Sequence, residues 1–569
     1  MRRVLTTPRL VGAGALVIAA VGVLLVTQSA PAERSDPAKA EPTGRQTVAV
    51  SPTSTVDAER QSAILAGEDQ RLLSLVTSVR PGSGPYSQDV GAVQTLVLTA
   101  RGLDYGLSDL VALGAAEVQP DDAVLITRHV FVAPGARLTI DAPGTTLRLR
   151  SDPSGFVSLV AWKAELALSG AEGRPLAVTS WDPELQRPDP ATVDGRAYVR
   201  DASGGMQLRF LAASDLGFWA GRTSGMAWTG SSRTAATGSA VSSTFRHNYY
   251  GAFASQGEGL AVAQSDFSGN TVDGLLLHRS TAQTAITDST ARGNGRHGFS
   301  ADHGSELVSY TAVTAEENGA YGLFFSGSPL SEGPSASGAS LRGYGQVVVS
   351  GGTFRKNEKA GLRVVDGKDV AIADTRVEDN TDGIVLAGAA APTKVERSTV
   401  TGNRRFGISV TRGSAVVTHN EVSGSRTAIQ VRDAAVAVTG NTIRRATEHA
   451  ISVVGAAAGS SLERNTIGGR GPSGLDVYRV DAGVTVSAAG NDVTGWTRDR
   501  DDLTYWSDFA PNHPMLLLWV ALLGTPLVLT LRGRHQRVAP GTSPYQDDLR
   551  RDRAARPMHV EPRLAGRSA

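Results

Sequence analysis

The feature that most constrains the fold is an asparagine that recurs every 23 or 24 residues in the middle of the chain. Six segments align on it: NTVDGLLL at 270, NGRHGFSA at 294, NGAYGLFF at 318, NEKAGLRV at 357, NTDGIVLA at 380 and NRRFGISV at 403. The one longer interval, from 318 to 357, holds an insertion, SGSPLSEGPSASGASLRG. A second series of asparagines, at 420, 441, 465 and 491, has a similar period.

Short Val-, Ile- and Leu-rich segments between these asparagines predict a parallel β-helix. Each coil of such a fold contributes three short strands that pair with the same strands above and below, so no coil buries its apolar face alone. Asparagine tolerates the left-handed geometry of a tight turn, and its amide can bond to the asparagine one coil away. Leucine-rich repeats share the period but need a repeated L-x-x-L-x-L pattern, which this sequence lacks. We expect the β-helix to run from 121 to 495.

Composition excludes several kinds of chemistry. The 569 residues include 64 glycines and no cysteine, so disulfides, thiol catalysis and zinc–thiolate sites are ruled out. The formal net charge is only +1, which gives no indication of a nucleic-acid partner.

Two apolar runs predict membrane attachment. Residues 1–32 have a basic start, an apolar run from Leu10 to Val26 and an Ala30-Pro31-Ala32 cleavage pattern, which fits either a signal peptide or an uncleaved signal anchor. The run 515–531 is uncharged and is followed by arginines, as in a transmembrane helix, although a buried core helix is the alternative. Basic residues at the outer ends of both runs predict a cell-membrane protein with cytoplasmic termini and an extracytoplasmic middle.

The segments between these landmarks complete the predicted domain organisation. Residues 33–56 read as a disordered linker, and 57–120, which begins with apolar residues at helical spacing, as a helical stalk and cap of the β-helix. Residues 496–514, with Trp496 and further aromatics, read as a juxtamembrane segment. The basic tail at 532–569 is predicted to be disordered and cytoplasmic.

A candidate catalytic group follows from the repeat. His278 lies eight residues after Asn270 and Asp302 eight residues after Asn294, so the two should stand on adjacent coils, with His303 beside them. A neutral histidine can accept a proton while a carboxylate orients it. A cation such as Arg279 could neutralise the carboxylate of an acidic sugar. This chemistry needs no metal and no cofactor; the alternative is a polar surface row without chemistry.

Residues around this group are candidates for holding an extended polymer: Arg246, His247, Tyr249, Tyr250 and His297. Aromatic rings can stack on sugars, and the middle coils are where this chain concentrates them. The alternative for each ring is that it fills the core or a loop. The aromatic residues concerned are Trp181, Tyr198, Phe218, Trp219, Trp228, Tyr249, Tyr250, Phe253 and Tyr321.

Several of these blocks resemble the periplasmic, calcium-independent mannuronan (alginate) C5-epimerases. The likeness is carried by FRHNYYGAFASQGEGLAVAQSDFSGNTVDGLLLHRS and GNGRHGFSADHGSE, and extends over about residues 120 to 430. The resemblance implies a right-handed parallel β-helix that removes the C5 proton of a uronate in a polymer and returns it from the other face. It also implies that His278 is the base.

The sequence departs from the family at the residues around that base. The family motif is D-P-H-D, but its first two positions are Leu276 and Leu277 here, and its last is deleted or replaced by Arg279. The position that matches the family's essential arginine holds Asp302 or His303, and no arginine occurs between 297 and 341.

Two functions therefore remain open at the level of sequence. The chain is either an epimerase of a polyuronate exopolysaccharide (less favoured, a lyase), or a non-catalytic β-helix that binds and escorts such a polymer during export. A structural surface protein is a weaker third alternative. The expected partners are an acidic polysaccharide, the membrane and a membrane glycosyltransferase complex, with no nucleic acid.

Overall fold

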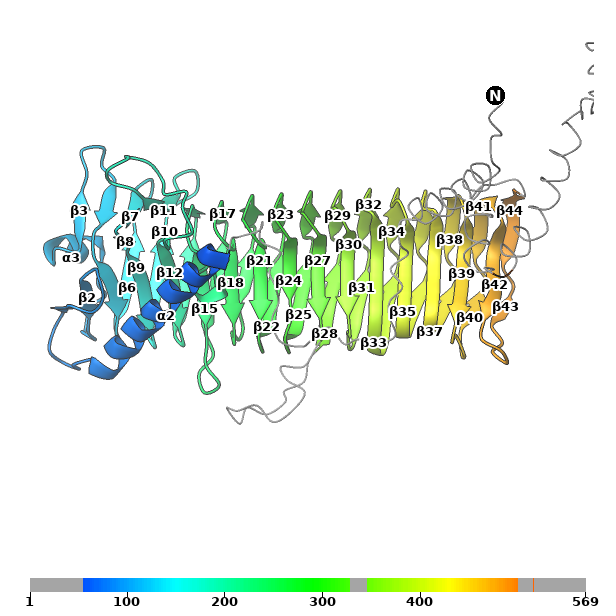
Figure 1. Ribbon diagram of the computed structural model, residues 1–569, viewed down its shortest axis with the longest axis horizontal. Coiled ribbons are helices and arrows are strands. Elements are labelled where there is room, and N and C mark those ends of the chain that lie inside the picture. The colour runs from blue at the N-terminus through cyan, green and yellow to red at the C-terminus, as the bar shows by residue number, and fades with distance from the viewer. Residues whose placement is uncertain (1–54, 328–344, 500–514, 516–569) are drawn as a thin grey trace, which may run out of the picture. The chain divides into compact units, whose positions relative to one another are not determined.

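The predicted parallel β-helix is confirmed by a computed structural model, which describes residues 55–327, 345–499 and 515 (Figure 1). Each coil has three short strands, one on each of three faces. In the coil that contains His278 these are β21 (Leu275–His278), β22 (Ala282–Thr287) and β23 (Thr290–Arg292). Neighbouring coils pair in parallel, strand on equivalent strand, as in β21 with β24 and β23 with β26.

The first face carries the candidate site. Its strands are β2 (Thr95–Leu98), β5 (His129–Val132), β9 (Ser158–Trp162), β12 (Tyr198–Ala202), β15 (Met226–Thr229), β18 (Ala252–Ser255), β21, β24 (His297–Ala301), β27 (Tyr321–Ser326), β30 (Ala360–Val365), β33 (Asp382–Glu396), β35 (Phe406–Thr418), β37 (Thr427–Thr439), β39 (His449–Gly455) and β42 (Ser473–Val480).

The other two faces close each coil. The second face has β6 (Arg137–Asp141), β10 (Glu165–Ser169), β13 (Gly205–Arg209), β16 (Thr237–Val241), β19 (Ala261–Ala263), β22, β25 (Glu306–Thr311), β28 (Gly345–Ser350), β31 (Val370–Ala373), the later halves of β33, β35 and β37, β40 (Ser461–Glu463) and β43 (Ser487–Ala489). The third face has β4 (Val124–Ile126), β7 (Thr146–Asp152), β11 (Leu176–Trp181), β14 (Leu211–Ser214), β17 (Thr244–Arg246), β20 (Asp266–Ser268), β23, β26 (Thr314–Glu316), β29 (Thr353–Arg355), β32 (Arg376–Glu378), β34 (Thr399–Thr401), β36 (Glu421–Ser423), β38 (Thr442–Ala446), β41 (Thr466–Gly471) and β44 (Asp492–Arg498).

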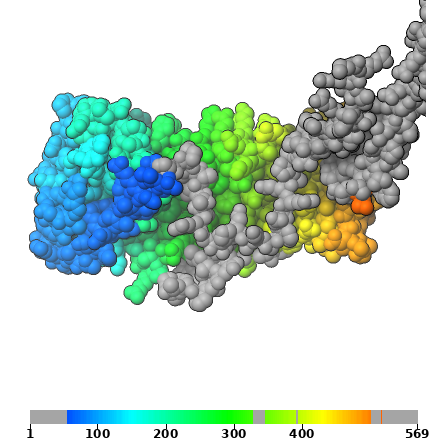
Figure 2. Space-filling model, in the orientation of Figure 1, coloured from blue at the N-terminus to red at the C-terminus, as the bar shows by residue number. Residues whose placement is uncertain are grey.

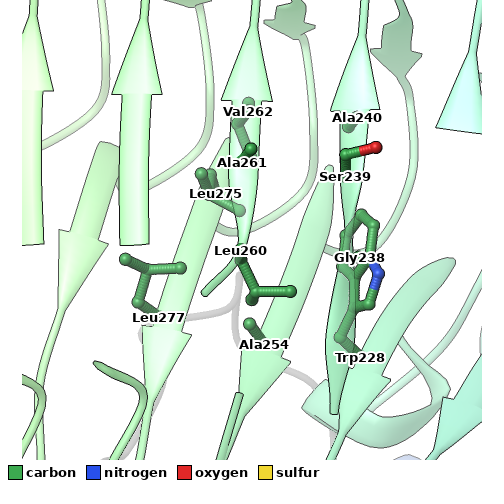
Figure 3. Close-up of a pocket in the computed structure, with 10 residues that line it drawn as sticks. All are labelled: Trp228, Gly238, Ser239, Ala240, Ala254, Leu260, Ala261, Val262, Leu275 and Leu277. Carbon is green, nitrogen blue, oxygen red and sulfur yellow. The ribbon is translucent and has the colours of Figure 1, made fainter. Parts of the chain in front are cut away.

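The core fills the inside of the coils because side chains alternate along each strand. In β21, Leu275 and Leu277 point into the common core, whereas Leu276 joins a separate apolar cluster on the outside of the first face. Trp228 also lies inside, where its indole nitrogen donates to the carbonyl oxygen of Met206 at 3.0 Å. Figure 3 shows a pocket lined by Trp228, Leu275, Leu277 and their neighbours, which is part of this apolar interior.

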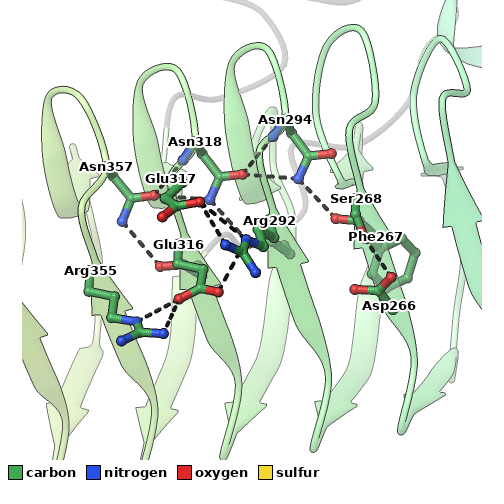
Figure 4. A network of polar contacts seen from close by, with 12 residues as sticks. Asp266, Phe267, Ser268, Arg292, Asn294, Glu316, Glu317, Asn318, Arg355 and Asn357 are labelled. Carbon is green, nitrogen blue, oxygen red and sulfur yellow. Dashed lines mark hydrogen bonds and ion pairs between the residues drawn. The ribbon is translucent and has the colours of Figure 1, made fainter.

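The repeated asparagines form a buried ladder at the corner before the first face (Figure 4). The side-chain nitrogen of Asn270 donates to Oδ1 of Asn294 at 2.9 Å, and Asn294 donates to Asn318 at the same distance. The backbone N–H of Asn270 donates to the same Oδ1 of Asn294 at 3.1 Å. The second series lies at a different corner, between the second and third faces, where Asn420 donates to Asn441. Both series thus link consecutive coils through buried amides.

Glycine follows the asparagine because the coils approach closely there. A Cβ atom at Gly274 would lie 2.5 Å from the carbonyl oxygen of Gly298 in the next coil. Any larger residue would push the two coils apart at the start of the first face.

The observed boundaries of the β-helix correct the prediction at both ends. Parallel pairing begins upstream of 121, because β2 already pairs in parallel with β5. The first coils also contain short antiparallel additions: β1 (Tyr86–Gln88), β3 (Ala116–Val118) and β8 (Gly155–Phe156), with the helix α3 (Leu107–Ala112) and the 3-10 turn η1 (Gly221–Thr223). At the other end, Trp496 lies in β44 and packs against the core instead of belonging to a juxtamembrane segment.

The helix predicted near residue 57 is present as α2 (Thr55–Ser78), but it is not a free stalk. It lies against the outside of the first coils (Figures 1 and 2), where Leu75 packs with Val97, Phe131 and Tyr198 of the first face. The sequence predicted a stalk and cap without placing the helix on the side of the coils, because amphipathic spacing shows that a helix has an apolar side but not what covers it.

A buried polar cluster fixes α2 to the coils. Glu68 and Arg71 form an ion pair at 2.5 Å, and Arg71 also donates to Ser158 of β9 at 2.7 Å and to Thr95 of β2 at 3.2 Å. The hydroxyl of Tyr198 donates to Glu68. The hydrogen bonds to the coil surface offset the cost of removing these polar groups from water.

The predicted membrane segments fall almost entirely outside the described residues. This applies to 1–32, to the linker up to residue 54, to 515–531 except Met515, and to the tail. Most of the insertion after β27 also lies outside. Among the residues that the structure describes, no helix is both long enough and apolar enough to cross a membrane.

Docking of α2 should weaken as the pH falls. Burial lowers the pKa of His129, which faces the cluster, from 6.5 to about 3. Burial opposes ionisation of Glu68, but the hydrogen bonds and charge of Arg71 outweigh it and lower the pKa of Glu68 to about 2. Since both pKa values rise to ordinary values when α2 leaves, the undocked state binds more protons below pH 6.5, and docking weakens by up to about tenfold per pH unit for the histidine alone.

Hydrogen exchange of residues 55–78, corrected for the intrinsic pH dependence, measures this effect. Protection should fall between pH 7 and pH 5, and His129→Gln should remove most of that fall. Equal protection at both pH values in the unmodified protein would contradict the prediction.

Candidate functional site

His278 is the last residue of β21 and belongs to the outer surface of the first face. Strand alternation places Leu277 in the core and His278 outside it, with 30 % of the side chain exposed. The chain then turns sharply, because Arg279 and Ser280 both have left-handed backbone angles, with φ of 44° and 57°. Arg279 is exposed at this turn, directly beside the histidine in the chain.

Asp302 comes from the next coil and joins two histidines. Its Oδ1 lies 2.6 Å from Nδ1 of His278 and 3.2 Å from Nδ1 of His303. The two imidazole ring centres are 4.9 Å apart. The carboxylate is buried, with 2 % exposed, whereas the imidazoles are about one-third exposed, 30 % and 33 %. The predicted meeting of these three residues across adjacent coils is therefore observed.

The charges of this group follow from its geometry. Burial opposes ionisation of Asp302, but its hydrogen bond with His278 and the close imidazole of His303 outweigh burial and hold its pKa well below the usual range. An ionised carboxylate can only accept hydrogen bonds, so Nδ1 of His278 must carry the hydrogen. Nε2 of His278 is then left with the lone pair that a general base needs. The Asp302 carboxylate, 3.2 Å from Nδ1, raises the pKa of His303, although burial opposes the shift.

The same three residues offer the ligand set of a cation site. One atom from each of His278, Asp302 and His303 lies within 4.8 Å of the others. Two imidazole nitrogens and a carboxylate oxygen suit a transition-metal ion such as Zn²⁺. Such an ion would take up lone pairs that proton transfer requires, so metal binding and base chemistry compete at this site.

Two of the predicted polymer-binding residues lie away from this group. Arg246 belongs to β17 on the third face and pairs with Asp266 at 2.9 Å. His247 follows it, 68 % exposed, with Nδ1 4.0 Å from Asp215. The structure does not bring Arg246 or His247 together with His278, because the chain turns a corner between β17 and β18.

The other three predicted polymer-binding residues lie on the first face, as His278 does, but they are buried. Tyr249 and Tyr250 keep only 2 % and 5 % of their surface exposed and pack with Phe253 and Leu276. His297 is also buried, and burial lowers its pKa to about 4, so it is uncharged at neutral pH. These side chains therefore present little surface to a polymer, contrary to what their outward direction in the repeat suggests. The alternating pattern identifies outward residues but does not show which of them are covered.

One buried ion pair near the site was not predicted. Arg296 binds Asp273 of the preceding coil through two bonds of 2.6 and 2.8 Å, and Asp273 also accepts a bond from Ser300. A signal was present in the sequence, because Asp382 and Arg405 repeat the same pairing at the same spacing. These pairs join consecutive coils at the edge of the first face.

Replacing Asp302 by Asn should lower the pKa of His303, because the neutral amide no longer stabilises the imidazolium. Histidine NMR titration of the full-length protein labelled with ¹³C in its histidines measures this change. His419, an exposed residue beyond β35, serves as the internal control. An unchanged or higher midpoint for His303 would show that Asp302 does not set its charge.

Comparison with known proteins identifies relatives in fold. A family model described as "Right handed beta helix region" matches residues 324–425. No curated protein sequence matches the chain. The structure of the periplasmic alginate epimerase AlgG is similar over 75 % of this chain and 97 % of that one, with 12 % identity and a TM-score of 0.53.

A point mutant of the same epimerase matches over 70 % of this chain and 85 % of that one, with 14 % identity and a TM-score of 0.51. At such low identities the likeness concerns the fold. It agrees with the resemblance carried by the sequence blocks and confirms the handedness expected from them. The chain is thus a right-handed parallel β-helix protein, similar in fold to the periplasmic alginate epimerase AlgG.

Proposed function

We propose that the first face binds an acidic polysaccharide and that His278 removes the C5 proton of a uronate unit in it, as a polyuronate C5-epimerase does. The observation that carries this proposal is the buried carboxylate of Asp302 shared by two partly exposed imidazoles. This arrangement orients one ring nitrogen as a base and keeps a second imidazole, that of His303, beside it.

Removal of the proton uses only groups of this site. The C5–H bond of the uronate breaks, its proton goes to Nε2 of His278, and the electron pair moves into the sugar carboxylate as an enolate. Positive charge near that carboxylate lowers the barrier, which the His303 imidazolium and Arg279 can supply. A proton from water delivered to the other face of C5 gives the epimer, and the proton on His278 is then lost to water. If the oxygen at C4 instead leaves with a proton from water, a C4–C5 double bond forms and the product is that of a lyase.

The degenerate D-P-H-D motif does not argue against this chemistry, because the carboxylate partner comes from another coil. In the family the acidic residues flank the histidine along the strand, whereas here Asp302 reaches His278 at 2.6 Å from the adjacent coil. A second candidate is a non-catalytic escort that binds the polymer without changing it. The missing family arginine favours it.

Deuterium exchange distinguishes the two. Full-length protein incubated with polymannuronate in D₂O should introduce deuterium at C5, detected by NMR of the recovered polymer. His278→Gln should lower the rate by roughly 10²- to 10⁴-fold, because it removes the base. His419→Gln is the matched control and should exchange at the unmodified rate.

The same experiment distinguishes the epimerase from a lyase and from the non-catalytic escort. A signal from an unsaturated sugar would indicate the lyase. Binding of the polymer without any deuterium uptake by the unmodified protein would exclude base chemistry and leave the escort.

We also propose that this β-helix stands on the extracytoplasmic side of the cell membrane, close to a membrane glycosyltransferase that makes the polymer. The support is the pair of apolar runs, 10–26 and 515–531, with basic residues at their outer ends. Both anchors would hold the first face near a polymer as it emerges.

Protease accessibility in sealed cells tests this arrangement. An epitope inserted in the linker near residue 45 should be digested, whereas one at the C-terminus should be protected until the cells are opened. Protection of both epitopes, or digestion of both, would contradict the predicted topology.

A further inference from the structure

Three aromatic rings stack on the first face, in the two coils that follow His278. His297 begins β24, and Tyr321 and Phe324 lie in β27 (Figure 1). The ring centre of His297 lies 5.0 Å from those of both Tyr321 and Phe324, at interplanar angles of 13° and 22°. The Tyr321 and Phe324 ring centres are 5.7 Å apart at 19°. The three ring planes are thus nearly parallel and their centres form a compact triangle, with Tyr321 and Phe324 at equal distances from His297; we call this group the ring platform.

The ring platform is only partly covered by the protein. His297 lies buried, and its Nδ1 has no hydrogen-bond partner among the described residues. Tyr321 and Phe324 are partly exposed. A flat aromatic face carries partial negative charge and attracts the C–H groups of a sugar ring. A packing role alone would more often bury such rings completely, as it does for Phe299 and Phe325 on the same strands.

An arginine that forms no ion pair with any carboxylate in the described part of the chain lies beside the platform. The Arg363 guanidinium in β30 is 5.5 Å from the ring centre of Tyr321, and no ion pair of this side chain occurs within the described ranges. Arginines on the third face of nearby coils are paired: Arg355 with Glu316 and Arg376 with Glu378. A guanidinium held over a ring keeps its donors free for a carboxylate ligand.

Strand register puts these groups in line with the catalytic group. Leu276, two residues before His278, pairs with Ser300, which pairs with Phe324, which in turn pairs with Arg363. Coils are spaced by about 4.8 Å, so Arg363 lies roughly 10 Å along the first face from the β24 strand that leads to Asp302. An extended polymer on this face would therefore meet His278, the ring platform and Arg363 in that order.

We propose that Phe324, Tyr321 and Arg363 form a subsite for another uronate unit of the same polymer chain. The ring of that sugar stacks on the partly exposed rings, and its carboxylate, or that of the next unit, pairs with the Arg363 guanidinium. The proposal rests on the proposed function in one respect, namely that the polymer lies along the first face. These three residues would bind a part of the polymer that lies away from the reacting carbon.

Binding to two matched sugars tests the subsite. Isothermal titration calorimetry of the full-length protein would use an oligomannuronate long enough to span three coils, and the same oligomer with its carboxylates reduced to alcohols. Arg363→Gln should weaken oligomannuronate binding by roughly 10-fold or more, because a charge-assisted bond is lost, and should leave the reduced oligomer unaffected. Phe324→Leu should weaken both oligomers similarly, since stacking does not depend on the carboxylate.

Arg376→Gln is the matched control, because Arg376 is an exposed arginine on the third face with its own acidic partner. The affinities of this variant for both oligomers should stay within about twofold of those of the unmodified protein. Equal affinity of Arg363→Gln and unmodified protein for oligomannuronate would overturn the subsite, as would an equal loss for both oligomers.

Deuterium exchange on the same variants separates this proposal from the preceding one. If the affinity pattern holds and the unmodified protein exchanges no deuterium, the subsite stands and the epimerase proposal fails. If the unmodified protein exchanges deuterium and Arg363→Gln binds normally, only the subsite fails. If the unmodified protein binds neither oligomer, both proposals fail.

Discussion

The structure depends on one hydrogen bond that is repeated from coil to coil, from the side-chain amide of a buried asparagine to Oδ1 of the next. Asn270, Asn294, Asn318 and Asn357 are joined in this way at 2.9 Å. The same oxygen also accepts a backbone N–H, so the buried polar groups at each corner are satisfied. A buried amide without such partners would be costly. The ladder therefore fixes the register of every strand that follows it, and a slip by one residue would turn the apolar side chains outward.

That fixed register creates the candidate site. Residues at equal distances from consecutive asparagines must meet, and this is how His278 and Asp302 come together although they are 24 residues apart. The carboxylate that the epimerase family keeps beside its histidine along the strand is provided here by a neighbouring coil. Along the strand, the histidine lacks the acidic neighbours of the family motif. Across the coils, it has an acidic partner in Asp302.

The outside of the first face is used in two ways. Over the first coils it is covered by α2, whose Glu68 and Arg71 reach Ser158, Thr95 and Tyr198. Over later coils it presents partly exposed His278, His303 and Phe324. The helix thereby restricts the part of this face that a polymer could use to the coils that hold these side chains. The same backbone supports both uses because successive coils differ only in the side chains that point outward.

The sequence by itself determined the parallel β-helix, since only stacked coils satisfy a 23- or 24-residue period of Asn, Gly and short apolar strands. It also determined the pairing of His278 with Asp302, because that contact depends only on register. The docking of α2, the burial of Tyr249, Tyr250 and His297, and the placement of the Arg363 guanidinium beside the Tyr321 ring were decided by the tertiary structure. These properties depend on which distant side chains cover or neutralise an outward residue. A periodic pattern predicts whether a side chain points outward, but it does not predict whether another part of the chain buries that side chain.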